Sequence, residues 1–168
     1  GNDGLGNSGG REFDLGSQAG GLIMLIYASS GPEYFAEHGE AFINSAKNCG
    51  HQVKVDLVAD FPGWRKQLRY ESERVLSCWL RYLQLPEMLD QTDVLVMDID
   101  SIINRPIEIG PCDMALFFRP WIAPKRENLQ VLMTASYWNK KAKPFAERVR
   151  GRLLSQFNKW SDDQVAVW

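Results

Sequence analysis

An apolar run that ends abruptly at charge constrains this chain more than any other feature. Val94 to Met97 is followed directly by Asp98, Ile99 and Asp100. The run predicts a buried strand of a parallel sheet rather than a helix, because an Asn, an Arg and a Pro soon break the apolar pattern. Ligands bind at the carboxyl ends of such strands. Strand alternation points Asp98 and Asp100 the same way, so the two carboxylates can converge on one hard cation.

The alternative for the same residues is a strand followed by an acidic turn that binds nothing. Asp-x-Asp alone carries little weight, since Asp is frequent in turns. The apolar strand that leads into the motif favours the functional interpretation.

The surrounding residues predict an alternation of strands and helices. Further strands are expected at 22–28, 52–58, 113–118 and 129–135, and helices at 32–49, 71–91 and 144–157, with a short last helix from about 161. In the first helix Tyr34, Phe35, Ala41, Phe42 and Ala46 recur at helical spacing. Pro86 marks a kink or a restart of the second helix. A strand, a helix and a strand in succession predict a right-handed crossover and a parallel pair, and hence an α/β fold.

Composition narrows the class of protein. With 168 residues, 45% of them hydrophobic, the chain can bury one sizeable core. A formal net charge of -2 argues against nucleic acid as a partner. No apolar stretch approaches the roughly 20 residues of a membrane span, and no signal peptide is recognisable. Three separated cysteines predict free thiols in a reducing compartment. We therefore expect a cytoplasmic protein.

The two ends of the chain bear on its domain organisation. Residues 1–21 hold eight glycines and predict a flexible arm or linker, and residues 22–168 are expected to form a single domain. The chain does not begin with Met and ends at Trp168 within an apolar pattern. Two arrangements therefore stay open: a domain that lacks its C-terminal part and a piece of a larger parent chain. A homo-oligomer stays open as well.

Three pieces follow one another along the chain: Arg81 to Leu89, the run DVLVMDID, and Trp160 to Gln164. Their order resembles the nucleotide-sugar-dependent glycosyltransferases of the GT-A class. In that class a helix with an Arg, an aromatic residue and a Leu-Pro pair leads into a strand ending in Asp-x-Asp, and a Trp-x-x-Asp-Gln-like element lies further on. The resemblance covers about residues 22–168. It implies a three-layer, Rossmann-like α/β fold of GT-A type with a mostly parallel central sheet.

The resemblance also implies how a nucleoside-diphosphate sugar would bind through its phosphates. Asp98 would approach the ribose or a divalent cation, Mn²⁺ or Mg²⁺, and Asp100 would coordinate this cation, which bridges the diphosphate. Arg81 would support the same phosphates, for which a planar guanidinium is suited. The alternative for Arg81 is a pair with Glu71 or Glu87 on a solvated helix face.

The remaining implied roles concern the base and the sugars. Tyr27 and Ser29, placed just past the first strand, would lie where the base and ribose bind. Asp163 and Gln164 would face the transferred sugar, and Asp163 is the candidate catalytic residue. Tyr27 could instead fill the core, and Asp163 could cap the last helix. The acceptor hydroxyl is not identified.

One departure from the family and two rival functions stay open. Many members add a third metal ligand, often a His, but no His follows Asp100 here. A non-catalytic nucleotide-sugar-binding or structural module of a larger protein is the first rival. A phosphatase of the haloacid-dehalogenase type is the second, and the short chain after the motif disfavours it.

Overall fold

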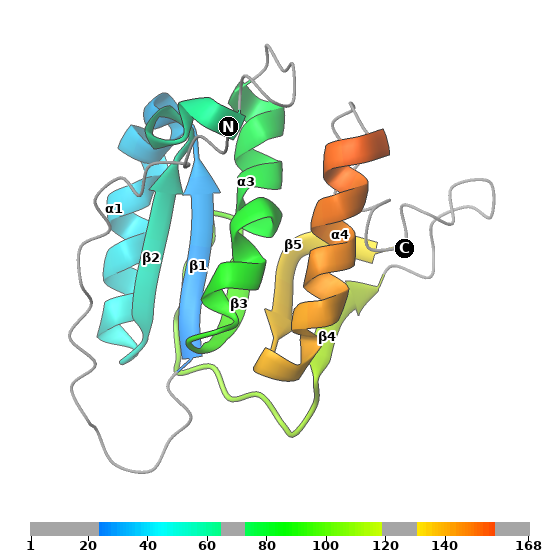
Figure 1. The fold of residues 1–168 in the computed structure, drawn as a ribbon. Helices are drawn as coiled ribbons and strands as arrows, with labels where there is room; N and C mark the ends of the chain where they lie inside the picture. Colours follow the sequence, from blue (N-terminus) through cyan, green and yellow to red (C-terminus); the bar gives the residue numbers. More distant parts are fainter. Residues whose placement is uncertain (1–23, 65–72, 119–130, 157–168) are drawn as a thin grey trace.

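A computed structural model describes residues 24–64, 73–118 and 131–156, and a five-stranded sheet forms their centre (Figure 1). The strands are β1 (Met24–Ser30), β2 (Gln52–Leu57), β3 (Asp93–Met97), β4 (Met114–Phe118) and β5 (Val131–Trp138), in the order β2-β1-β3-β5-β4. β1 pairs in parallel with both β2 and β3. β5 runs antiparallel to its neighbours β3 and β4. The predicted parallel centre is confirmed, whereas the reversed strand was not predicted.

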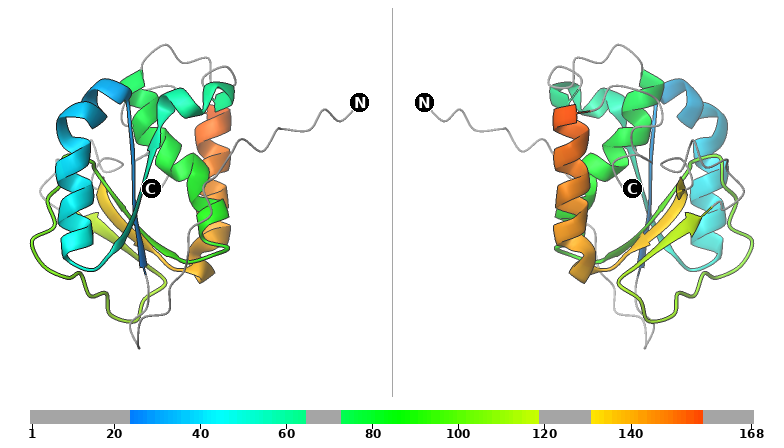
Figure 2. Two further views of the ribbon diagram at one scale, coloured as in Figure 1. Left: turned by 90° about the vertical axis from the view of Figure 1, so that its left-hand side faces the viewer. Right: turned by 90° about the vertical axis from the view of Figure 1, so that its right-hand side faces the viewer.

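Helices cover both faces of this sheet. They are α1 (Pro32–Asn48), α3 (Glu73–Met88) and α4 (Lys143–Gln156). A short 3-10 turn, η1 (Val58–Asp60), follows β2, and a second, η3 (Lys140–Ala142), joins β5 to α4. Two views at right angles to Figure 1 show α1 on one side of the sheet and α3 and α4 on the other (Figure 2). The predicted mixed α/β fold is confirmed, and its arrangement is Rossmann-like.

The core lies on both faces because the central strands are apolar at successive positions. In β1, Ile26 packs with the α1 cluster, while Tyr27 belongs to the cluster of α3 and α4. In β3, Leu95 faces α1, and Val94 and Val96 face α3. Burying each such aliphatic side chain is worth about 1.5–3 kcal/mol, so the apolar run from Val94 to Met97 favours a central place for β3.

Two residues set the ends of α1. Pro32 occupies the first turn, where its missing N–H breaks no helical hydrogen bond. Gly50 has a φ of 80°, a left-handed conformation that glycine adopts without steric strain, and it ends the helix as predicted. Of the kink or restart expected at Pro86, the restart is wrong, since α3 continues through Pro86 to Met88.

Several predicted boundaries shift by a few residues. β1 runs on to Ser30, two residues past the expected end at residue 28, and β5 runs on to Trp138. The predicted arm at 1–21 and the last helix near 161 lie outside the described residues. Of the helices in the described part of the chain, none combines the length and the apolar character that crossing a membrane requires.

Candidate functional site

The candidate site lies at the edge of the sheet where the parallel strands end. β1 and β3 are neighbours that run in the same direction, so Ser30 and Asp98 mark the same edge. Gly31 follows Ser30 and leads directly into the first turn of α1. This edge therefore brings together the end of β1, the start of α1 and the Asp-x-Asp segment.

Asp98 and Asp100 lie in a turn rather than on an extended strand. β3 ends at Met97, and the Ser101 N–H donates to the Asp98 carbonyl at 3.1 Å. The expectation that strand alternation aligns both aspartates is therefore wrong. Their arrangement depends instead on Ile99, which lies between them and is buried in the α1 cluster. This buried side chain anchors the turn, while Asp98 is partly exposed and Asp100 is exposed.

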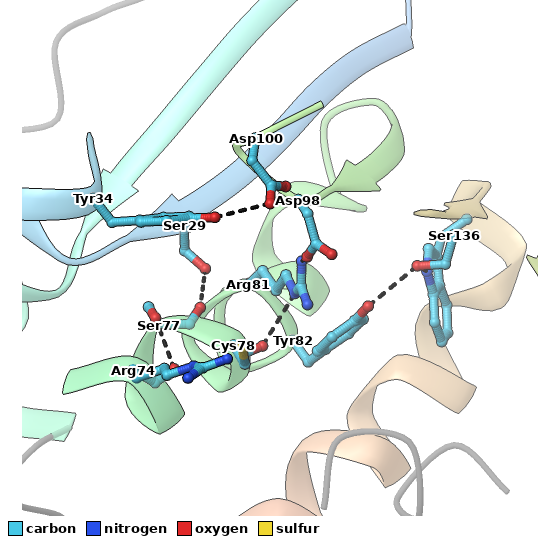
Figure 3. A network of polar contacts seen from close by, with 11 residues as sticks. Ser29, Tyr34, Arg74, Ser77, Cys78, Arg81, Tyr82, Asp98, Asp100 and Ser136 are labelled. Carbon is cyan, nitrogen blue, oxygen red and sulfur yellow. Dashed lines mark hydrogen bonds and ion pairs between the residues drawn. The ribbon is translucent and has the colours of Figure 1, made fainter. Parts of the chain in front are cut away.

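Asp98 is held by Arg81 from α3. The Arg81 Nη1 atom donates to Asp98 Oδ1 in an ion pair, and Nε donates to the Cys78 carbonyl at 3.1 Å (Figure 3). Arg81 is 4% exposed, while the Asp98 side chain is 31% exposed. A solvated helix face for Arg81 is therefore wrong, and Glu87 pairs with Arg150, while Glu71 lies outside the described residues. The Arg81 guanidinium therefore binds Asp98 from the protein interior.

Asp100 is held by Tyr34 from the first turn of α1. The Tyr34 hydroxyl donates to Asp100 Oδ2 at 2.8 Å, and Figure 3 shows the two side chains reaching toward each other. The pKa of Tyr34 is raised, chiefly by this hydrogen bond. Sequence spacing counted Tyr34 among the apolar residues of the helix, but it is 46% exposed. The available signal was its place in the turn that follows β1, at the edge where ligands bind.

Tyr27 and Ser29 lie within β1, so their expected place past the strand is wrong. The Tyr27 ring is fully buried, and its hydroxyl donates to Asp56 at 2.8 Å. Burial, with Asp56 adding to it, raises the pKa of Tyr27 well above its ordinary value. The Ser29 hydroxyl donates to the Ser77 carbonyl of α3. Tyr27 is a core residue, as the alternative predicted, and Ser29 joins β1 to α3.

The segment after Asp100 is fastened to the C-terminal end of α1, which the sequence did not reveal. The Ile103 N–H donates to Ser45 Oγ at 3.1 Å, and Cys49 Sγ donates to the Ile103 carbonyl at 3.3 Å. His51 Nε2 accepts from the Ile107 N–H at 2.9 Å. Burial lowers the pKa of His51, in keeping with a neutral acceptor. These bonds limit the movement of the acidic turn.

Asp98 and Asp100 can hold a divalent cation if waters and a substrate supply its remaining ligands. Within residues 24–64, 73–118 and 131–156, no three His, Cys, Asp or Glu side chains gather to hold a metal ion. Mg²⁺ commonly takes one or two protein carboxylates and completes its shell with waters and substrate phosphates. Asp98 and Asp100 match that pattern. The predicted Asp163 and Gln164 lie outside the described residues.

The fold is similar to that of a solved glycosyltransferase. The crystal structure of a glycosyltransferase involved in the glycosylation of the major capsid of PBCV-1 superposes with a TM-score of 0.61 at 16% sequence identity. The match covers 86% of this chain and 74% of that one. No family model and no curated protein matches the sequence. The likeness is therefore one of fold.

Proposed function

We propose that this protein transfers a sugar from a nucleoside-diphosphate sugar to an acceptor hydroxyl, with Mn²⁺ or Mg²⁺ held by Asp98 and Asp100 in a domain of GT-A type. One observation carries the proposal: two carboxylates stand at the carboxyl end of the central strand β3, in a fold similar to that of a glycosyltransferase. Two independent side chains, Arg81 and Tyr34, hold these carboxylates.

Charge at the site supports an anionic ligand that arrives with a cation. Asp98 and Asp100 outweigh the single guanidinium of Arg81, so the group carries one negative charge in excess. A divalent cation reverses that sign and makes the edge attractive to a diphosphate. When bound, the cation neutralises the charge that develops on the leaving nucleoside diphosphate.

Arg81 takes a different role in this proposal from the one the sequence implied. A side chain that is 4% exposed and bonded to Asp98 does not reach a ligand directly. Arg81 fixes the orientation of the Asp98 carboxylate and leaves its Oδ2 atom for the cation. It therefore acts on the phosphates through Asp98, as a positioning residue.

Fewer residues contact the base and ribose of the donor in this proposal than the resemblance implied. Tyr27 is left out because its ring is buried in the core. Ser29 stands close to the site edge but is 9% exposed, so its part is to shape the end of β1. The roles of Asp163 and Gln164 at the transferred sugar stay predictions.

The test is release of nucleoside diphosphate from a panel of nucleotide sugars, with water or a simple glycoside as acceptor. We expect one donor to be cleaved only with Mn²⁺ or Mg²⁺, and Asp100→Ala to lose this turnover. The matched control is Asp90→Ala, which removes an exposed aspartate near the start of β3, where it pairs with Lys143. Turnover that persists in Asp100→Ala, or falls equally in Asp90→Ala, would contradict the proposal. Donor binding without turnover would favour the non-catalytic module.

A further inference from the structure

We infer that Tyr34 is a positioning residue for the metal ligand Asp100, which it orients for a divalent cation while leaving its negative charge intact. The inference rests on the proposed metal site and deepens it. It assigns a function to a residue that is remote from the Asp-x-Asp motif in sequence.

Tyr34 is well placed to impose one orientation on Asp100. The Phe35 N–H donates to the Gly31 carbonyl at 3.0 Å, so the backbone beside Tyr34 belongs to the first turn of α1. The Tyr34 ring also stands edge-on to His38, with centroids 4.4 Å apart. The hydroxyl that reaches Asp100 is therefore carried by a side chain with a second contact on the same helix.

Asp100 needs such a partner because nothing buries it. Its side chain is exposed and lies in a turn, where a carboxylate samples several rotamers. The hydrogen bond from Tyr34 engages Oδ2 and leaves Oδ1 for a cation (Figure 3). Because the carboxylate is already ordered before the cation binds, less conformational entropy is lost on binding.

The two aspartates receive donors of different charge. Arg81 brings a positive charge to Asp98, whereas Tyr34 gives Asp100 a neutral hydroxyl. The Arg81–Asp98 pair is therefore neutral in sum, whereas the Tyr34–Asp100 pair keeps a net negative charge for the cation while its geometry is held. Hydrogen-bond partners of ligating carboxylates commonly contribute about 10–100-fold to metal affinity, which sets the size of the expected effect.

The test measures Mn²⁺ binding alone, by electron paramagnetic resonance of the free ion, in wild type and in Tyr34→Phe. We expect Tyr34→Phe to weaken Mn²⁺ binding by about tenfold. Tyr137→Phe is the matched control, because it removes a Tyr hydroxyl that donates to Asp93 at 2.9 Å near the start of β3. This control should leave Mn²⁺ affinity unchanged. Adding Tyr34→Phe to Asp100→Ala should cause no further loss.

Each other result has a definite meaning. Equal or tighter Mn²⁺ binding by Tyr34→Phe would overturn the inference alone, since the hydroxyl would then be idle or compete with the cation. Wild type that binds no Mn²⁺ would overturn both the inference and the proposed metal site. Mn²⁺ binding that depends on Tyr34 and Asp100, without turnover of any donor, would refute only the transferase.

Discussion

Replacing Asp98 with Ala should destabilise the fold as well as the site, and by more than replacing Asp100. Asp98 is the carboxylate that pairs with Arg81, whose side chain is almost completely buried. Asp100 is exposed, and the hydroxyl that donates to it belongs to Tyr34, a side chain that is itself exposed. The two aspartates of the motif therefore contribute unequally to the stability of the fold.

The expected losses in the free energy of unfolding follow from how deeply Arg81 and Asp98 are buried. Removing one partner of a buried ion pair costs about 3–5 kcal/mol, and we expect about 3 kcal/mol for Asp98→Ala because water reaches part of the pair. Arg81→Met removes the buried charge and leaves Asp98 in contact with water, so its cost should be about 1–2 kcal/mol. Asp100→Ala should cost less than about 1 kcal/mol, as for most exposed positions.

Urea unfolding followed by tryptophan fluorescence measures these differences, and the double variant Arg81→Met/Asp98→Ala completes the cycle. It should lose less stability than the two single changes together, by about 1–2 kcal/mol, because residues in one ion pair are coupled. Equal unfolding midpoints for Asp98→Ala and Asp100→Ala would refute this reasoning. Strict additivity in the cycle would refute it as well.

Two further predictions concern the end of α1. His51 has a lowered pKa in the fold, so its contribution to stability is complete above its ordinary pKa of 6.5 and is lost as the pH falls toward the folded value. The variant His51→Gln carries an amide that can still accept from the Ile107 N–H. Between about pH 7.5 and 5, its free energy of unfolding should therefore drop less than that of wild type, and an equal drop would contradict this prediction. Gly50→Ala should cost about 1–2 kcal/mol in thermal unfolding because of its positive φ, while Gly110→Ala, which also meets no neighbouring atom, should cost little.

The sequence was most informative where burial on both faces left a continuous apolar run. Val94 to Met97 became β3, and the strand, helix and strand before it became a parallel pair around α1. These predictions succeeded because run length, Pro32 and Gly50 each have a local physical reason. The structure accordingly places Asp98 and Asp100 at the end of a central strand.

The direction of individual strands and the hydrogen-bond partners of polar side chains were harder to predict. Residues 131–138 are mostly apolar, and nothing in such a pattern shows that β5 runs against β3. Arg81 and Asp98 meet across 17 positions, a contact set by the rotation of α3 against the sheet. Tyr34 was misjudged because an aromatic residue counts as apolar in a helical pattern, although its hydroxyl is satisfied at the surface.

A metal-assisted donor site at the end of β3 is tested by calorimetric titration of UDP, GDP and their common sugar conjugates. The titration compares wild type, Asp100→Ala and the control Asp90→Ala, each with Mn²⁺ and with a chelator. We expect one nucleotide to bind wild type and Asp90→Ala only with Mn²⁺. Asp100→Ala should weaken this binding by about 100-fold or more, since a direct metal ligand should matter at least as much as its hydrogen-bond partners. Binding that ignores the chelator, or that survives in Asp100→Ala, would contradict a metal-assisted donor site at the end of β3.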